Sequence, residues 1–169
     1  LCRYPLPPMI IDPVMVSTSG SRLMEPDALS LFQATLLPLS TLLTPNIPEA
    51  ELLAGRPIHG LEDMKAAARQ ILQMGPKAVL VKGGHGQGRE KTDLLLIDGS
   101  FHTFSSATIS TRNTHGTGCT LSSAVAAFLA HGLPLDEAVV CAKEYINVAI
   151  IAGAEYEIGK GHGPVHHFF

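Results

Sequence analysis

Residues 41–54 read Thr-Leu-Leu-Thr-Pro-Asn-Ile-Pro-Glu-Ala-Glu-Leu-Leu-Ala, an apolar run that stops at a polar turn and continues as a helix-like segment. We predict a strand over 41–43 and a helix over 49–54, which Gly55 ends at a C-cap position. The alternation extends to both sides, with strand-like runs at 9–11 and 78–81 and helix-like segments at 25–36 and 61–74. Alternating strands and helices predict an α/β domain with a mainly parallel sheet.

The second half of the chain adds a hairpin and two helices. Asp98-Gly99 between the runs 93–97 and 101–105 is a strong hairpin signal, which predicts an antiparallel addition to the sheet. We expect helices over 119–131 and 135–152, a loop over 159–169, and a mobile, solvated loop in the Gly/Gln/Arg/Lys-rich stretch 83–91.

Composition narrows the class of protein. A length of 169 residues with 46% hydrophobic residues fits a single domain over 1–169. Twelve basic and fifteen acidic residues give a net charge of −3 without a basic stripe, so we expect no nucleic-acid partner. No apolar run approaches the ~18 residues of a membrane span, so no membrane partner is expected. Cysteines at 2, 119 and 141 form neither a disulfide framework nor a CxxC metal site, which favours the reducing cytoplasm.

Residues 113–122, Asn-Thr-His-Gly-Thr-Gly-Cys-Thr-Leu-Ser, form a small-residue loop that opens a helix. The backbone N–H groups expected to lack an intrahelical partner are those of Gly116, Thr117, Gly118 and Cys119. The helix dipole adds positive charge at this point, which predicts a site for a phosphoryl group, and the thiol could act as base or nucleophile. The alternative is an ordinary helix start, capped by its Thr and Gly residues, with a buried cysteine that only packs.

Polar side chains also follow the predicted strands. They are Asp12, Asn46, Glu49 and Lys82. Ligands of open α/β sheets collect at the carboxyl ends of the strands, so these residues are expected at one edge. Asp12 and Glu49 would hold Mg²⁺ directly or through water, Asn46 would orient one of them, and Lys82 would place a positive charge at the transferring phosphate.

Three of these residues have a structural alternative. Asp12 before Pro13 could start a turn, Asn46 could serve turn chemistry, and Lys82 could be solvated. Their joint position on one edge, together with the loop at 113–119, favours phosphoryl transfer.

With these motifs, the chain resembles the hydroxymethylpyrimidine/phosphomethylpyrimidine kinases of thiamine biosynthesis, members of the ribokinase-like superfamily. The matching blocks are residues 12–16 with 19–20, 37–51, 79–85, 113–120 and 159–165. The resemblance implies a three-layer α/β/α sandwich and ATP-dependent phosphorylation of 4-amino-5-hydroxymethyl-2-methylpyrimidine or its monophosphate, with Mg²⁺. It also implies a cytoplasmic enzyme that is a homodimer at full length.

The resemblance assigns roles to individual residues. Gly116-Thr117-Gly118-Cys119 is similar to the superfamily's anion hole with its catalytic base, where most members carry Asp and the pyrimidine kinases carry Cys. Asn46-x-x-Glu49 is similar to its metal and phosphate motif. The implied catalytic residues are Cys119, Lys82, Gly116, Thr117 and Gly118; the ATP-binding residues are Asn46, Glu49, Lys82, Thr114 and Lys143; the substrate-binding residues are Val14 and Cys119; and the metal ligands are Asp12 and Glu49.

One feature of the family is missing. Its chains begin with a glycine-rich strand-turn segment, whereas this chain starts at Leu1, almost directly before a strand. We therefore expect an N-terminally truncated portion, about the C-terminal two-thirds of a kinase domain of ~250 residues, with little activity on its own.

Three other functions stay open at this point. A pyridoxal or pyridoxine kinase of the same superfamily would share the phosphate machinery. His115 and Cys119 could form the pair of a cysteine hydrolase. A non-catalytic regulatory module could bind the pyrimidine without turnover.

The tail histidines 162, 166 and 167 suggest a metal site, but the favoured interpretation of the tail is a solvated C-terminal loop.

Overall fold

The computed structural model describes residues 6–16, 23–84 and 90–169. The chain divides into two compact units, residues 1–107 and residues 108–169, and each unit is described by itself. A single domain over the whole chain stays a prediction. Ser19, Gly20 and His85 of the matching blocks, Cys2, and most of the stretch 83–91 lie outside the described residues.

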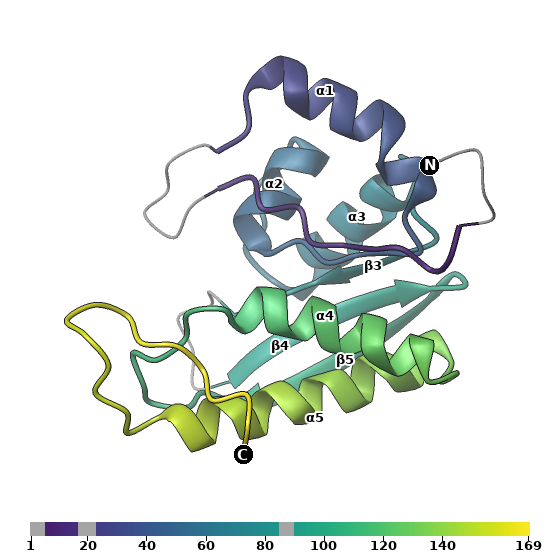
Figure 1. Ribbon diagram of the computed structural model, residues 1–169. Coiled ribbons are helices and arrows are strands. Elements are labelled where there is room, and N and C mark those ends of the chain that lie inside the picture. Colours follow the sequence, from purple (N-terminus) through teal and green to yellow (C-terminus); the bar gives the residue numbers. More distant parts are fainter. Residues whose placement is uncertain (1–5, 17–22, 85–89) are drawn as a thin grey trace. The chain divides into compact units, whose positions relative to one another are not determined.

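Unit 1 is built on a five-stranded sheet in the order β1-β2-β3-β4-β5. The strands are β1 (Ile10–Ile11), β2 (Leu42–Leu43), β3 (Ala78–Val81), β4 (Glu90–Ile97) and β5 (Ser100–Ala107). The three longer strands, β3, β4 and β5, are labelled in Figure 1. β1, β2 and β3 are parallel, and β4 is antiparallel to both β3 and β5. Among the described strands only β4 is reversed, which confirms a mainly parallel sheet with an added hairpin.

The hairpin turn has the predicted chemistry. Asp98 and Gly99 have φ values of 48° and 75°, the left-handed pair that a two-residue turn between twisted strands requires. The predicted limits 93–97 and 101–105 are too short, because pairing continues to Glu90 opposite Ala107. The polar ends of the strands remain paired, and the hydroxyls of Thr92 and Ser105 lie 3.2 Å apart.

Three helices belong to unit 1: α1 (Pro26–Thr35), α2 (Ile47–Ala54) and α3 (Leu61–Leu72), with a short 3₁₀ helix at Leu37–Leu39. The predicted start of α2 at Glu49 is wrong by two residues, because Asn46 caps the helix. Pro48 is tolerated there because N–H groups in the first turn have no intrahelical partner. Gly55 ends α2 with φ 63°, as predicted.

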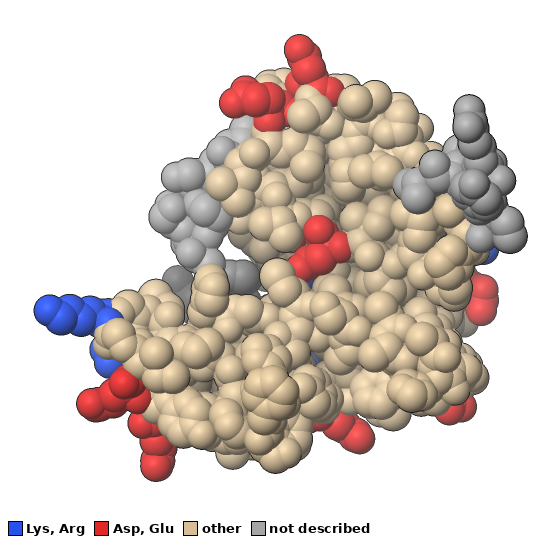
Figure 2. All heavy atoms as spheres, in the orientation of Figure 1, with Lys and Arg blue, Asp and Glu red and all other residues tan. Residues whose placement is uncertain are grey.

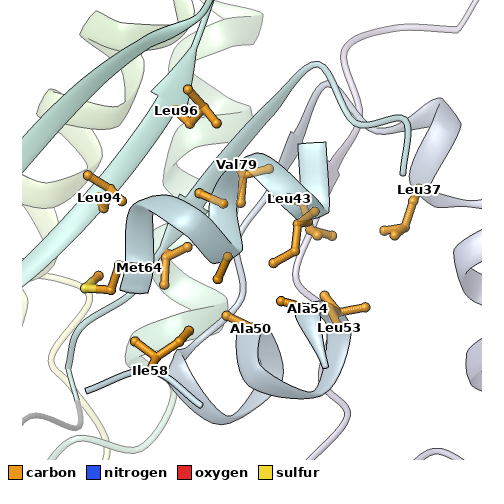
Figure 3. Close-up of a cluster of buried hydrophobic side chains, with 14 of the residues drawn as sticks. Leu37, Leu43, Ala50, Leu53, Ala54, Ile58, Met64, Val79, Leu94 and Leu96 are labelled. Atoms are coloured by element: carbon orange, nitrogen blue, oxygen red, sulfur yellow. The ribbon is translucent and has the colours of Figure 1, made fainter. Parts of the chain in front are cut away.

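The core of unit 1 lies between the strands and these helices (Figure 3). From the sheet it takes Leu43, Val79 and Leu94, and from the helices mainly residues of α2 and α3, among them Leu53 and Met64. The alternate strand residues Leu42, Leu80 and Leu95 point to the other face and are also fully buried. The central strands are thus buried on both faces, as parallel sheets are.

Unit 2 contains α4 (Thr117–Ala130) and α5 (Leu135–Gly153), which pack against each other, followed by the tail. The tail forms neither helix nor strand, but it is less solvated than expected. Val165 is buried, the N–H of His166 donates to the carbonyl of Ala149 at 3.0 Å, and Pro164 bridges to His115. The tail is held to unit 2 because these backbone bonds anchor it.

Two surface properties bear on the classes of partner considered above. None of the helices in the described part of the chain has the length and apolarity that crossing a membrane requires. Figure 2 shows a face that is mostly uncharged, on which the visible Lys and Arg side chains do not merge into a patch.

Candidate functional site

The strand ends of unit 1 bring an acid and a base together. Asp12 follows β1 and Lys82 follows β3, and the Nζ atom of Lys82 lies 2.7 Å from Oδ1 of Asp12. Thr44, which follows β2, donates its hydroxyl to the same oxygen at 3.1 Å. The side chain of Lys82 is only 14% exposed, so the interpretation of a solvated lysine is wrong.

Asn46 and Glu49 form a reciprocal cap at the start of α2. Oδ1 of Asn46 accepts from the N–H of Glu49 at 2.9 Å, and Oε2 of Glu49 accepts from the N–H of Asn46 at 2.9 Å. Oε1 of Glu49 also accepts from the N–H of Met15 at 3.3 Å. Asn46 therefore has a structural role, but as the N-cap of α2 rather than as a turn residue. Glu49 fixes the segment after β1 against α2.

Glu49 is buried, and burial raises the pKa of its carboxyl group above the ordinary value. The hydrogen bond with Asn46, the charge of Lys82 and the hydrogen bond with Met15 lower this pKa, and the negative charge of Asp12 raises it further. Because Glu49 feels the charges of both Asp12 and Lys82, the three ionisable groups form one electrostatic cluster at the strand ends.

The donor set of this cluster can be compared with the needs of Mg²⁺. The ion prefers oxygen ligands, keeps several waters and takes one or two protein carboxylates. Asp12 and Glu49 supply two such groups, and in the described residues no cluster of three or more His, Cys, Asp or Glu side chains is found. The residues present thus fit a hydrated Mg²⁺ better than a metal held entirely by protein.

In unit 2, the loop before α4 turns through a left-handed glycine. Gly116 has φ 86° and is the N-cap residue, and no side chain caps the helix. The N–H groups of Gly118 and Cys119, the second and third helical residues, precede the first helical hydrogen bond, which Thr120 donates to Gly116 at 2.8 Å. These amides are available to an anion.

One detail of this loop differs from the prediction, and a second contradicts the alternative interpretation. The N–H of Thr117 is already used, because the chain tightens into a turn and the group donates to the carbonyl of Thr114 at 3.2 Å. Cys119 is exposed rather than buried, so the alternative of a cysteine that only packs is wrong. Cys119 is one of the residues that line a pocket of about 430 Å³, together with other residues of α4 and with Tyr145 and His167.

Asn113 connects the loop before α4 to the end of α5. It is buried, and its Nδ2 donates to the carbonyls of Gly153 at 2.8 Å and Tyr156 at 2.7 Å, where α5 ends. A side chain at Gly163 would collide with Asn113, and the carbonyl of Gly163 accepts from the N–H of His115 at 3.0 Å. The end of α5 and the tail therefore form a platform under residues 113–119, which we call the anion loop.

The remaining predicted residues lie as follows. Val14 is 52% exposed after β1, Thr114 is exposed in the anion loop, and Lys143 is partly buried in the middle of α5. Their binding roles stay predictions. No role is predicted from the sequence for Thr44 or Asn113. Each lies inside a matching block, and Thr44 also follows the predicted strand 41–43, so these are the signals that could have indicated them.

Comparisons with known proteins identify the family of the chain. The profile of the family described as phosphomethylpyrimidine kinase matches residues 1–166. A hydroxymethylpyrimidine/phosphomethylpyrimidine kinase of Rhizobium meliloti (strain 1021) is 52% identical over 160 residues, which cover 94% of this chain and 60% of the relative. The chain thus spans about three-fifths of the length of this curated relative.

Solved structures show the same fold. A phosphomethylpyrimidine kinase from Clostridium difficile 630 is 43% identical with a TM-score of 0.73, covering 85% of this chain and 57% of the other. A pyridoxal kinase from Staphylococcus aureus in complex with AMP-PCP is 34% identical with a TM-score of 0.85, covering 94% of this chain and 57% of the other. The fold is the α/β fold of the ribokinase-like kinases, and the chain belongs to the phosphomethylpyrimidine kinase family.

Proposed function

We propose that the protein carrying this chain transfers the γ-phosphoryl group of ATP to 4-amino-5-hydroxymethyl-2-methylpyrimidine, to its monophosphate, or to both, in thiamine biosynthesis. One observation carries the proposal: residues 1–166 match the phosphomethylpyrimidine kinase family. The exposed position of Cys119 at the uncapped start of α4 supports it. The identity of 52% to a hydroxymethylpyrimidine/phosphomethylpyrimidine kinase supports the choice of substrate.

The chemistry follows from the groups present. The amides of Gly118 and Cys119 at the head of α4 would stabilise the charge that develops on the transferred phosphoryl group. Lys82 would supply a compact positive charge to the same group. Since little covalent chemistry falls to the protein in phosphoryl transfer, positioning and charge stabilisation are expected to supply most of the rate.

Cys119 would accept or orient the proton of the attacking hydroxymethyl group or phosphate. An alcohol is far less acidic than a thiol, so a cysteine is a weak base for this substrate and orientation is its larger contribution. Its exposed position beside the two amides supports this role.

We assign Asp12 and Glu49 to Mg²⁺, with Asn46 orienting Glu49 through their reciprocal cap. Bound Mg²⁺ would neutralise charge on the phosphates of ATP. Asn46, Glu49, Lys82, Thr114 and Lys143 are the proposed ATP-binding residues, and Val14 and Cys119 the proposed contacts to the pyrimidine. We further propose a cytoplasmic homodimer with neither a nucleic-acid nor a membrane partner.

A pyridoxal kinase is the second candidate. Pyridoxal kinases of Staphylococcus aureus superpose with TM-scores up to 0.85, above the 0.73 of the pyrimidine kinase structure. The sequence identity has the opposite order, 34% against 43%, and substrate choice depends on side chains rather than on the backbone. We therefore propose the pyrimidine rather than pyridoxal as the substrate.

The test is a comparison of substrates in the full-length protein. With ATP and Mg²⁺, ADP release is measured for hydroxymethylpyrimidine, for its monophosphate and for pyridoxal, with each phosphorylated product identified by mass spectrometry. We expect a higher kcat/KM for a pyrimidine than for pyridoxal. A preference for pyridoxal supports the second candidate, and pyrimidine binding without ADP release supports a regulatory module.

A further inference from the structure

Asp93 is a buried carboxylate that the proposed mechanism does not use. It lies in β4, next to the apolar run Leu94–Leu96, and is 8% exposed. Its Oδ1 accepts the backbone N–H of Gly83 at 2.7 Å. Burying a charged side chain costs free energy of folding unless hydrogen bonds compensate for the lost water. The contact with Gly83 supplies one such bond, and we ask what else it does.

The contact occurs where β3 leaves β4. The ladder between these strands ends with Val81 opposite Leu94, so the next pair in register would be Lys82 and Asp93. Lys82 instead bridges to Asn46 on the other side, and its N–H donates to the carbonyl of Pro45 at 2.8 Å. The side chain of Asp93 then takes the next N–H, that of Gly83.

The backbone at Gly83 is closely packed and leaves no space for a side chain. A Cβ atom there would overlap the carbonyl group of Thr92, so Gly83 lies flush against the backbone of β4. Lys82 is thus held between two fixed backbone hydrogen bonds, one from its own N–H to Pro45 and one from Gly83 to Asp93. Its side chain leaves this clamp to reach Asp12.

We propose that Asp93 is a positioning residue for Lys82: by holding the N–H of Gly83, its carboxylate fixes the direction in which Lys82 presents its ammonium group to the phosphate. This inference rests on the proposed kinase function. A hydrogen bond to a carboxylate is stronger than one between neutral groups, so an amide oxygen in the same place would hold Gly83 less firmly, and an apolar side chain not at all.

The experiment compares three variants of the full-length protein. Asp93→Leu removes the acceptor, Asp93→Asn keeps an oxygen acceptor without the charge, and Asp98→Asn makes the same chemical change at the exposed turn of the hairpin as a control. We expect kcat to fall about 10²-fold in Asp93→Leu, the cost of a misplaced catalytic group. In Asp93→Asn we expect a loss of about fivefold, the difference between charged and neutral hydrogen bonds. KM for the pyrimidine should change less than about twofold in both variants. The interactions that bind the pyrimidine equally in the ground state and the transition state do not involve Asp93.

A double-mutant cycle separates positioning from general loss of structure. Combined with Lys82→Ala, Asp93→Leu should cause no further loss of kcat or ATP affinity, because its effect acts through Lys82. Equal losses with and without Lys82, or a wild-type kcat in Asp93→Leu, would overturn the proposal. If Asp93→Leu does not fold, the cycle is run with Asp93→Asn, and additive losses there overturn it equally.

A readout without turnover keeps this test distinct from the proposed function. The amide proton of Gly83 should resonate at low field in the wild type and move upfield in Asp93→Asn, measured by NMR on labelled protein. An unchanged resonance would contradict the contact. Absence of kinase activity in the wild type would contradict the proposed function instead, while the amide resonance and ATP affinity would still report on Asp93.

Discussion

The ammonium group of Lys82 and the carboxylate of Asp12 lie 2.7 Å apart, although 70 positions separate them in the chain. β1 and β3 flank β2 on either side, so the two residues meet across the end of β2, where Thr44 also reaches Asp12. An ion pair of this kind holds a positive charge at the edge of the sheet before any substrate arrives. Preorganised charge of this sort is what phosphoryl transfer requires.

Replacing Lys82 with Ala should reduce kcat about 10²–10³-fold, the range measured when one charge-stabilising donor is removed from an active site. ADP release by the full-length protein is the measurement. Lys77→Ala is the matched control, because Lys77 is exposed at the opposite end of β3. Equal activity in the two variants would rule out the proposed role of Lys82.

The strand ends could be predicted from the sequence because each apolar run stops at a polar residue, as at Asp12 and Lys82. The hairpin turn was equally local, since Asp98-Gly99 specifies it. Contacts such as Asn113 to Tyr156 or Gly83 to Asp93 could not be predicted. They join segments that are 10 to 43 residues apart, and no local pattern reports them.

Helix boundaries show the same limit. The predicted start of α2 at Glu49 is two residues too late, because Asn46 and Glu49 cap the helix and Pro48 lies inside its first turn. The exposure of Cys119 was also beyond sequence reasoning, since free cysteines are usually buried. The residue types of the candidate site were thus predictable, while their hydrogen-bond partners required the fold.

Cys119→Ala should lower kcat about 10²-fold with little change in the melting temperature, because proton transfer and orientation are lost while an exposed side chain contributes little packing. Cys119→Asp should retain more activity, since a carboxylate can also orient the proton. Cys141→Ala, a change in α5, is the control. Wild-type turnover in Cys119→Ala would remove the assignment.

The buried carboxyl group of Glu49 predicts a pH-dependent stability. Its pKa is raised above the ordinary value of 4.5, so the folded state binds more protons than the unfolded state between these two pKa values. Its contribution is therefore complete below pH 4.5 and is lost as the pH rises through the raised pKa. Urea unfolding of the wild type and of Glu49→Gln is measured without metal. As the pH rises over this window, the unfolding free energy of the wild type should fall relative to that of Glu49→Gln. A difference independent of pH would contradict the shift.

Asn113→Asp should weaken the platform of the anion loop. The buried amide donates to the carbonyls of Gly153 and Tyr156, and a carboxylate has no N–H to offer them. Leaving a buried acceptor unpaired costs about 1–3 kcal/mol, so the melting temperature of the full-length protein should fall by several degrees.

The same change should raise KM for ATP, because the loop that presents the amides of Gly118 and Cys119 loses its support from α5. Asn147→Asp makes the identical substitution at a partly buried position of α5 and should leave KM for ATP near the wild-type value. Lowering the pH protonates the new carboxyl group of Asn113→Asp and gives it one donor, so part of the lost stability should return under acid conditions. If Asn113→Asp loses stability but binds ATP with unchanged KM, the platform supports only the fold, and the link from the end of α5 to the anion loop is refuted.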